Sequence, residues 1–377
     1  MKKFMCFIMS FIIFVGVAPT VYGAEKDNKS DVKAYVLMDM DSKTVLEAKN
    51  ENERLSPASV TKIMSLLIIA EAIDNKKITL NDKVATTKDA VSKGGSQIWL
   101  ELGEEMTVDE LLKAVVIASA NDACTSLGDY VSGSQTAFVA EMNKKAKDLG
   151  LKNTNFENCT GLDDTTVNHY SSAYDLAIIS SELMKHNLVQ KYSTIWLDSL
   201  RDGKTELNNT NKLVNTYKGI TGLKTGTTSN AGFCISATAT RDNLNLVAVV
   251  LGADSSEKRF DTASQLLDTG FASYEAYSPK IDTNKIKPVK VQYGIVKSVV
   301  PTVPKDISVT VKKGHNKISC KYDIKKSVKA PIKAGDSLGS ISVMCDGKVL
   351  RKYEVISPKS IKKVTFIDLF KQLIVKI

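Results

Sequence analysis

Residues 59–70 read SVTKIMSLLIIA, a short polar start followed by an almost unbroken apolar run. A helix that is hydrophobic on nearly every side belongs in the middle of a domain, so this stretch predicts the central helix of the fold. Ser59 and Lys62 are three residues apart and therefore share one helical face. Free N–H groups at a helix start favour negative charge beside the Ser59 hydroxyl. These features suit a serine nucleophile with an amine as its base.

A serine three residues before a lysine is a weak signal by itself. The chain holds four such pairs, which begin at Ser30, Ser59, Ser255 and Ser360. Only Ser59 opens a buried helix, because the other three lie in polar or basic stretches. Taken alone, Ser59 is equally well explained as a residue that caps the helix.

The proposed base has to be neutral when it accepts a proton. An ordinary lysine has a pKa near 10.4, so at pH 7 only about one molecule in 2,500 carries it in the neutral form. Burial and a nearby cation both lower a lysine pKa. We expect burial, together with the charge of Lys224, to lower the pKa of Lys62.

Two further motifs follow in the chain. Ser119-Ala120-Asn121 comes just after a predicted helix that opens with a capping box of Thr107 and Glu110. Ser119 suits a proton relay, and the Asn121 amide offers a donor and an acceptor to a peptide backbone. Alone the triplet says little, since Ser and Asn are common at helix ends.

Lys224-Thr225-Gly226 lies in a strand predicted over residues 218–228. The amine and the hydroxyl suit a substrate carboxylate, and Gly226 permits close approach of an extended backbone at a sheet edge. The alternative for this motif alone is a strand that ends at a glycine turn.

The order of the three motifs resembles that of the active-site serine β-lactamases and penicillin-binding proteins. In its details the chain resembles the D-alanyl-D-alanine carboxypeptidases, the low-molecular-mass penicillin-binding proteins. The resemblance covers nearly the whole chain after the leader. It includes Gly94-Gly95-Ser96, Gly161-Leu162-Asp163, the segment 169–175 and Ala231-Gly232-Phe233.

The resemblance implies specific roles. Ser59 would be the acylated nucleophile, Lys62 its base, and Ser119 with Asn121 the second catalytic element. The other implied site residues bind substrate. Lys224, Thr225 and Gly226 on the strand would contact it directly, and Arg259 would be a further contact for its carboxylate. The backbone N–H groups of Ser59 and Thr227 would form the oxyanion hole. His169 is interpreted as structural, because its neighbours are helix-start signals.

The expected activity is removal of the terminal D-alanine from peptidoglycan stem peptides, with β-lactams acylating the same serine. A β-lactamase is the alternative within the superfamily, but the Glu-x-x-Leu-Asn pattern of one class is missing. The nearest stretch, Lys204-Thr205-Glu206-Leu207-Asn208, has lysine where glutamate is needed. A catalytically inactive wall-binding scaffold is the alternative from another class.

The chain predicts an α/β (α+β) domain of the DD-peptidase/β-lactamase type, with an antiparallel sheet packed by helices and completed from both chain ends. Short alternating β-branched runs after Pro279 predict a small all-β C-terminal domain. The expected divisions are a signal peptide over 1–24, a catalytic domain over 25–278, a β-rich domain over 279–356 and an amphipathic helix over 357–377.

Charge is unevenly distributed along the chain. Residues 280–377 carry 22 Lys and Arg against 7 Asp and Glu, and the chain from 25 to 279 has a net charge of −8. This is not the pattern of a nucleic-acid enzyme with a basic cleft. The last 17 residues are too charged to span a bilayer and predict a helix lying on an anionic membrane surface, or else one packed on its own domain.

The leader and the cysteines indicate export. Two lysines, a 14-residue apolar run from Phe4 to Val17 and small residues up to Ala24 predict a secretory signal, with an uncleaved anchor as the alternative. Five cysteines remain after the leader, an odd number that makes no disulfide framework, and whether Cys320 and Cys345 pair is left open. Neither the cysteines nor the three histidines have metal-site spacing, so no metal or organic cofactor is expected.

Overall fold

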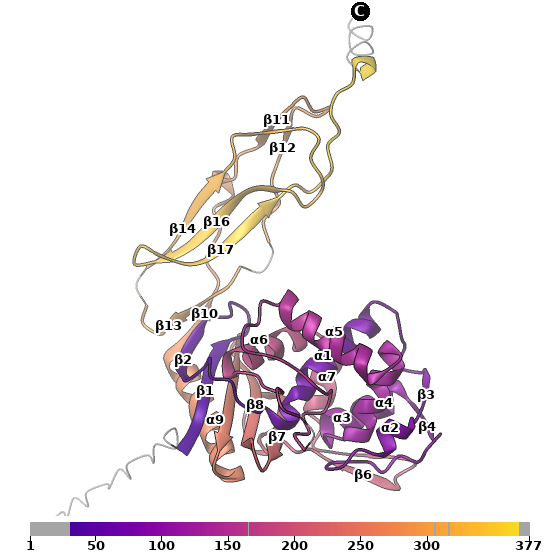
Figure 1. The fold of residues 1–377 in the computed structure, drawn as a ribbon. Helices are drawn as coiled ribbons and strands as arrows, with labels where there is room; N and C mark the ends of the chain where they lie inside the picture. Colours follow the sequence, from indigo (N-terminus) through magenta and orange to yellow (C-terminus); the bar gives the residue numbers. More distant parts are fainter. Residues whose placement is uncertain (1–30, 165, 305–306, 316, 369–377) are drawn as a thin grey trace, which may run out of the picture.

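The computed structural model describes residues 31–164, 166–304, 307–315 and 317–368. The described chain forms two parts (Figure 1). The larger part, from β1 to α9, combines a sheet with helices, and the smaller C-terminal part is built from strands. The predicted α/β (α+β) fold with an added all-β region is confirmed.

A five-stranded antiparallel sheet in the order β2-β1-β9-β8-β7 organises the larger part. Its strands come from both ends of that part, as predicted: β1 (Val32–Asp39), β2 (Val45–Lys49), β7 (Ile220–Thr228), β8 (Gly232–Arg241) and β9 (Leu244–Ala253). Alternate residues pack on opposite faces, so Val36 belongs to the core shared with the helices between β2 and β7, and Leu37 to the core under α9 (Ser256–Ser273). The Lys-Thr-Gly motif therefore lies on β7, an edge strand.

The helices between β2 and β7 pack on the face of the sheet opposite α9, with α1 at their centre (Figure 1). They are α1 (Lys62–Asp74), α2 (Lys88–Val91), α3 (Val108–Ile117), α4 (Asn121–Ser132), α5 (Gln135–Asp148), α6 (Ala173–Leu183), α7 (Asn187–Ser193) and α8 (Leu213–Thr216). Nearly every residue of α1 from Lys62 to Ala72 is buried, which confirms the predicted central helix. The capping box of Thr107 and Glu110 opens α3 as predicted.

Two short two-stranded sheets in this helical region were not expected. They are β3 (Lys83–Ala85) with β4 (Glu105–Thr107), and β5 (Leu197–Leu200) with β6 (Thr205–Asn208). Strands of three or four residues are too short for an alternating pattern to stand out from loop sequence. The turn between β5 and β6 contains Arg201, Asp202 and Gly203, all with positive φ.

The C-terminal part contains two three-stranded sheets, β12-β11-β15 and β14-β16-β17, and β10 pairs with β13. The strands are β10 (Tyr274–Tyr277), β11 (Val289–Gln292), β12 (Ser298–Val299), β13 (Val309–Lys312), β14 (Ile318–Ile324), β15 (Ser327–Lys329), β16 (Ser337–Cys345) and β17 (Lys348–Ile356). Cys320 on β14 and Cys345 on β16 are not bonded to each other, which answers the pairing left open by the sequence. They lie on neighbouring strands but in different register, since Cys320 faces Val343.

Two sequence predictions fall wholly or partly outside the described residues. The export signal over 1–24 lies outside them. The terminal helix predicted over 357–377 is described only as far as residue 368, and its start is corrected to residue 366, because Ile361 and Lys363 form β-bridges with Ile332 and Gly294. Thr365 caps its start, because its hydroxyl accepts a hydrogen bond from the backbone N–H of Asp368. Among the helices of the described ranges, none combines the length and the apolarity needed to cross a bilayer.

The central position of α1 makes a stability prediction. Leu67→Ala leaves a cavity in the main core and should lower the free energy of unfolding by about 2–5 kcal/mol in urea denaturation. Val45→Ala on β2, where the side chain is exposed, is the control and should change it by about 0.5 kcal/mol or less. Equal losses in the two variants would show that α1 is not the core helix.

Candidate active site

Ser59 and Lys62 are in direct contact. The Lys62 Nζ donates hydrogen bonds to the Ser59 Oγ at 2.9 Å and to the carbonyl oxygen of Thr160 at 2.9 Å. Ser59 was expected at the start of the central helix, but it lies in a 3-10 turn, η2 (Ala58–Thr61), and Lys62 is the first residue of α1. The turn displays the hydroxyl at the end of the helix while the lysine stays fully buried.

Two glycines allow other segments to reach this turn. A side chain on Gly161, whose φ is +82°, would put its Cβ 1.8 Å from the carbonyl oxygen of Ala58. A Cβ on Gly226 would lie 2.8 Å from the backbone nitrogen of Ser59. The sequence suggested that Gly226 makes room for substrate, whereas in the structure it makes room for the turn that carries Ser59. Strand β7 and the Thr160 loop therefore both pack closely against the turn that carries Ser59.

Lys224 extends from β7 into the same buried region. Its Nζ donates to the carbonyl oxygen of Thr225 at 3.0 Å, and the Thr225 hydroxyl donates to Thr210 Oγ1 at 2.7 Å. Burial, and then the charges of Lys62 and Arg259, hold the pKa of Lys224 well below its ordinary value. The two amines at 62 and 224 are thus close enough for the charge of Lys62 to lower the pKa of Lys224.

Burial lowers the pKa of Lys62 to about 8. The negative charges that Cys124, Cys159 and Asp122 can carry act in the opposite direction and raise it. The sequence predicted that burial and the charge of Lys224 would together lower this pKa. Burial is confirmed as the leading cause, whereas the repulsion between the two lysines lowers the pKa of Lys224. A lysine with a pKa near 8 is neutral in about one molecule in ten at pH 7.

The second motif contributes two buried polar atoms. Ser119 has a φ of +63°, rare for a residue with a side chain, and the turn leads directly into α4. Two hydrogen bonds fix Asn121. Its Nδ2 donates to the Gly94 carbonyl oxygen at 2.7 Å, and its backbone N–H donates to the Ser96 carbonyl oxygen at 2.7 Å. Ser119 Oγ and Asn121 Oδ1 are buried and have no hydrogen-bond partner among the described residues. A buried polar atom without a protein partner requires an explanation, and contact with a substrate is one.

Arg259 supports the end of β7. Its Nη1 donates to the Gly226 carbonyl at 3.0 Å and to Thr227 Oγ1 at 2.9 Å, and its guanidinium lies 4.7 Å from the ring centroid of Phe260. Burial lowers its pKa to about 10, so the group stays charged at neutral pH. The structure therefore brings this predicted carboxylate contact next to the motif on β7, where it holds the strand.

His169 has a positioning role. The backbone N–H of Glu157 donates to its Nδ1 at 3.1 Å, so the proton resides on Nε2, which lies 2.8 Å from Thr61 Oγ1. Burial lowers its pKa to about 4 and keeps the ring neutral. The side chain thus fastens the Thr160 loop region to the turn beside Lys62, which agrees with its interpretation as structural.

Some residues near the site were not found from the sequence. Thr160 acts through its carbonyl, which any residue supplies, so no residue type could reveal it. Asp122 follows Asn121 in α4, and its carboxylate accepts backbone N–H bonds from Ile98 and Leu100 at 3.1–3.3 Å. The position of Asp122 directly after the Ser-Ala-Asn motif was the sequence signal that could have identified it.

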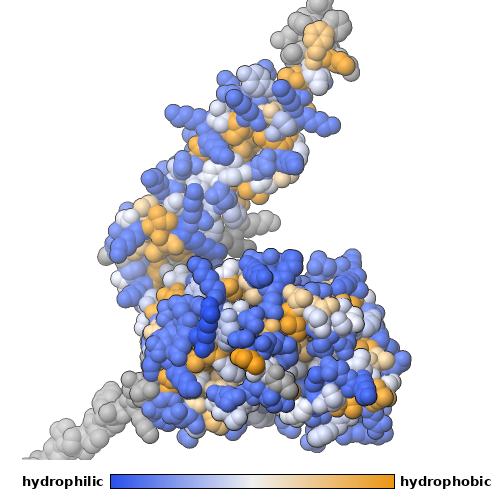
Figure 2. All heavy atoms as spheres, in the orientation of Figure 1, coloured by the Kyte–Doolittle hydropathy of each residue, from blue (hydrophilic) through white to orange (hydrophobic). Residues whose placement is uncertain are grey.

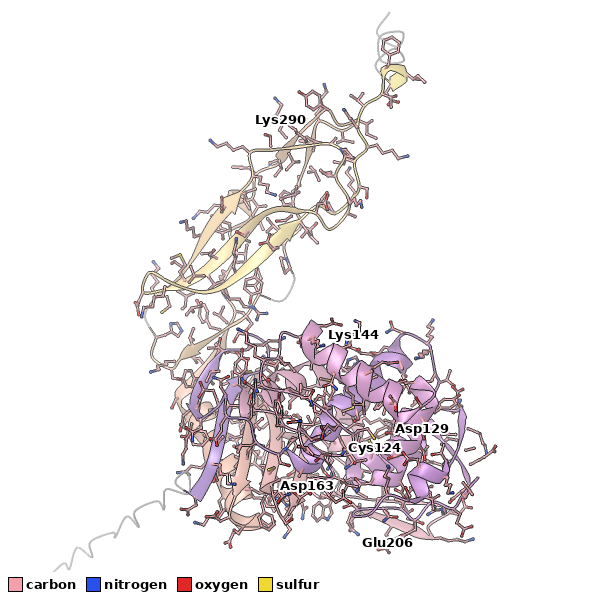
Figure 3. All side chains as sticks on the ribbon, viewed as in Figure 1. Cys124, Asp129, Lys144, Asp163, Glu206 and Lys290 are labelled. Atoms are coloured by element: carbon pink, nitrogen blue, oxygen red, sulfur yellow. The ribbon has the colours of Figure 1, made fainter. Side chains whose placement is uncertain are left out.

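Two thiols lie beneath Lys62. Cys124 and Cys159 are buried, and the Cys124 thiol donates to the Cys159 carbonyl at 3.4 Å. Their contact lowers the pKa of Cys124 and raises that of Cys159. Figure 3 places Cys124 within the helical half of the larger part. In the ranges that the structure describes, no three His, Cys, Asp or Glu side chains gather as a metal site requires.

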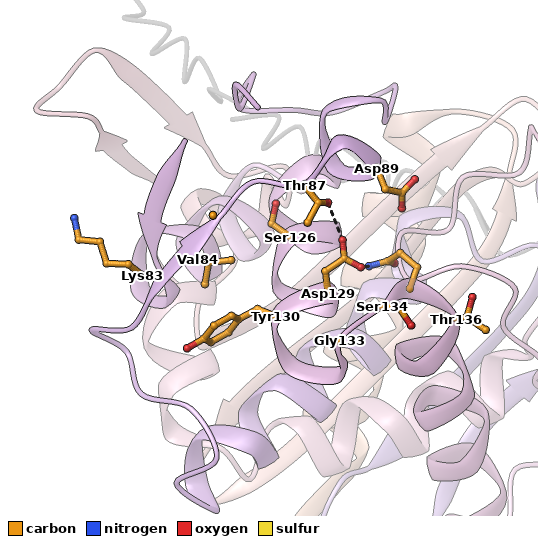
Figure 4. A pocket seen from close by; sticks show the side chains of 12 residues that line it. Lys83, Val84, Thr87, Asp89, Ser126, Asp129, Tyr130, Gly133, Ser134 and Thr136 are labelled. Carbon is orange, nitrogen blue, oxygen red and sulfur yellow. Dashed lines mark hydrogen bonds between the residues drawn. The ribbon is translucent and has the colours of Figure 1, made fainter. Parts of the chain in front are cut away.

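A separate pocket of about 700 Å³ lies between β3, α2, α4 and the start of α5 (Figure 4). Asp129 projects into it and is held by Thr87 and Gln135 at 2.7 and 2.9 Å. None of the nine predicted site residues lines this pocket. The motif residues instead meet where η2, β7 and the start of α4 converge.

Comparisons with known proteins agree with this geometry. Residues 21–255 match the family model described as D-alanyl-D-alanine carboxypeptidase, and residues 274–363 match that of the penicillin-binding protein 5 C-terminal domain. The D-alanyl-D-alanine carboxypeptidase DacF of Bacillus subtilis is 42% identical over 99% of this chain and 98% of its own length. DacA of Escherichia coli is 31% identical over 89% of this chain and 85% of its own.

Two solved structures extend the comparison. Penicillin-binding protein 5 of Haemophilus influenzae has a TM-score of 0.76 at 31% identity, covering 88% of this chain and 98% of that one. Penicillin-binding protein D2 of Listeria monocytogenes, in an ampicillin-bound form, has a TM-score of 0.58 at 32% identity, covering 64% and 97%. With both family models and a relative along nearly its whole length, the chain belongs to the D-alanyl-D-alanine carboxypeptidase family.

Proposed function

We propose that this protein is a serine-type D-Ala-D-Ala carboxypeptidase that trims peptidoglycan stem peptides and is acylated by β-lactams at Ser59. The observation that carries the proposal is the 2.9 Å hydrogen bond from the Lys62 Nζ to the Ser59 Oγ in a site where burial lowers the lysine pKa to about 8. A neutral amine at this distance is a general base within reach of the proton that it removes.

In the first step, Ser59 Oγ attacks the carbonyl of the penultimate D-alanine and its proton passes to Lys62. The backbone N–H groups of Ser59 and Thr227 bind the oxyanion, which is supported by the close approach of β7 to the Ser59 nitrogen. The C–N bond then breaks, and the terminal D-alanine leaves with a proton relayed from Lys62 through Ser119. Ser119 suits this role because its buried hydroxyl has no partner among the described residues.

In the second step, water attacks the ester, and its proton returns to Ser59 by way of Lys62. The shortened peptide is released and the amine is neutral again, so the cycle consumes one water molecule. No step requires a metal or an organic cofactor.

Substrate binding is assigned to β7 and its neighbours. Asn121 Oδ1, which has no partner among the described residues, accepts a substrate N–H. Lys224 and Thr225 bind the terminal carboxylate, and Arg259 adds positive charge while fixing Gly226 and Thr227. A bound carboxylate favours the protonated form of Lys224, and that charge in turn favours the neutral form of Lys62.

The β-lactamase alternative lacks a deacylating glutamate at the predicted place. Glu206 is exposed on β6, at the periphery of the larger part (Figure 3). An inactive wall-binding scaffold is disfavoured by the direct contact of Lys62 with Ser59 and by the buried, unpartnered Ser119 and Asn121 atoms.

The proposal includes the location of the protein. A leader over 1–24 directs export, the catalytic domain spans 25–278, the β-rich domain spans 279–356, and residues 357–377 attach the chain to the outer face of the membrane. The substrate lies outside the cytoplasm, which is consistent with this arrangement. A lysine-rich C-terminal region provides attraction to anionic lipid.

The nucleophile is tested by Ser59→Ala. The variant should take no label from labelled penicillin and release no D-alanine from a peptide that ends in D-Ala-D-Ala, because no other group forms the ester. Ser92→Ala, at an exposed serine near α2, is the control and should behave as the parent chain. A correctly folded Ser59→Ala protein that still releases D-alanine would reject the assignment, and a parent chain that takes no label would favour the inactive scaffold.

The base is tested by the pH dependence of penicillin acylation. Since the lowered pKa means that Lys62 is charged below about pH 8, the acylation rate constant should rise about tenfold from pH 6 to pH 7 and level off above about pH 8 to 9. The midpoint of this pH profile describes the Lys62 and Lys224 pair as a whole, because the two amines interact. Lys62→Arg, whose side chain stays charged, should show very slow acylation. A flat profile from pH 6 to pH 8 in the parent would contradict the proposal.

The tail is tested by deleting Ser360–Ile377. The shortened chain should leave the membrane fraction after sedimentation, because the predicted amphipathic helix is gone. Its rate on a soluble D-Ala-D-Ala peptide should stay unchanged. Sedimentation with membranes at the parent level would show that the tail is not the anchor.

A further inference from the structure

The turn between β11 and β12 is joined to the start of the tail. The backbone N–H of Ile295 donates to the Lys362 carbonyl at 3.1 Å, and that of Val364 donates to the Tyr293 carbonyl at 2.8 Å. Gly294 and Lys363 form the antiparallel bridge between them. This end of the C-terminal part is the one remote from the larger part (Figure 1). Turn and tail start therefore form one surface, here called the distal tip (residues 293–295 and 362–367).

The distal tip exposes large apolar side chains. Tyr293 is 62% exposed, Ile295 46%, Phe366 81% and Ile367 64%. Tyr293 also has a φ of +58°, a conformation that is unfavourable for a bulky residue. A cluster of exposed apolar side chains on one end of a domain indicates a surface that is covered in use.

Positive charge surrounds these side chains. The segments 286–300 and 357–368 contain Lys287, Lys290, Lys297, Lys359, Lys362 and Lys363, against a single acidic residue, Asp368. All six lysines are exposed, and Lys290 is seen at this end in Figure 3. Figure 2 shows hydrophobic residues among hydrophilic ones on the same end.

We propose that the distal tip docks onto an anionic lipid bilayer, with Tyr293 and Ile295 inserted beside Phe366 and Ile367 in the headgroup region. The proposal rests on the membrane attachment of the tail proposed above and adds a second contact, made by the folded domain itself. A phenol ring suits the boundary because its body is apolar and its hydroxyl polar. Lysines around an apolar centre match a surface with negative headgroups and an apolar interior.

Two contacts on one rigid unit have a mechanical consequence. Because backbone hydrogen bonds tie the turn to residues 362–364, insertion of both fixes the direction of the β domain relative to the bilayer. A tail on a loose linker would leave that direction free. The larger part lies at the opposite end, so docking of the tip holds the Ser59 site away from the lipid.

The test measures binding of the chain 25–377 to vesicles of phosphatidylcholine alone and of phosphatidylcholine with phosphatidylglycerol. The double variant Y293S/I295S should partition about tenfold more weakly into the anionic vesicles, because two apolar contacts are lost. V349S/L350S is the matched control: it removes two exposed apolar side chains from β17 and should bind as the parent does. Penicillin labelling of every variant reports an intact larger part.

A second pair tests the charge. K290Q/K297Q should weaken binding to anionic vesicles several-fold at low salt, and the difference should shrink as salt is added. Partitioning of Y293S/I295S equal to that of the parent would overturn the proposal, as would equal binding of the parent to the two kinds of vesicle. Deleting Ser360–Ile377 removes residues 362–367 of the tip as well as the tail, so the comparison of this deletion with Y293S/I295S separates the two proposals. If that deletion releases the protein while Y293S/I295S changes nothing, the tail is the anchor and the turn is not part of it.

Discussion

Burial of the Lys62 amine against the Ser59 hydroxyl is the constraint on which the rest of the site depends. Water would keep this amine charged, so its removal from water is what lowers its pKa toward the range that the proposed base requires. The cost of burial is limited by the hydrogen bonds to Ser59 and to the Thr160 carbonyl. The surrounding helices and the buried face of the sheet enclose α1 and exclude water from it.

Close backbone approach brings the separate motifs to this one place. Gly161 and Gly226 admit the Thr160 loop and β7 against the turn at Ser59, where any side chain would collide with backbone atoms. Arg259 then holds the carbonyl of Gly226, and His169 holds Thr61 from the other side. The arrangement of the candidate site is thus determined by packing of main chain on main chain, which allows little freedom at each contact.

The fold and the motif residues were largely predictable, because they depend on local signals. The apolar run of α1, the capping box at Thr107 and the paired strands β8 and β9 all have patterns long enough to be recognised. The strands of the two-stranded sheets β3–β4 and β5–β6 are too short for this, and Thr160 contributes only a carbonyl. Burial was correctly predicted as a cause of the lowered pKa of Lys62, but no single stretch of sequence reveals which segments, such as the Thr160 loop, converge on the amine.

The protonation of Lys62 itself can be measured by an NMR titration of the protein with ¹³C-labelled lysine side chains, using Lys62→Arg to assign its signal. Burial predicts one lysine with a midpoint near pH 8 that disappears in the variant, and a second shifted signal from Lys224. An ordinary midpoint for Lys62, near 10.4, would contradict a neutral amine as the base and with it the chemistry assigned to Ser59.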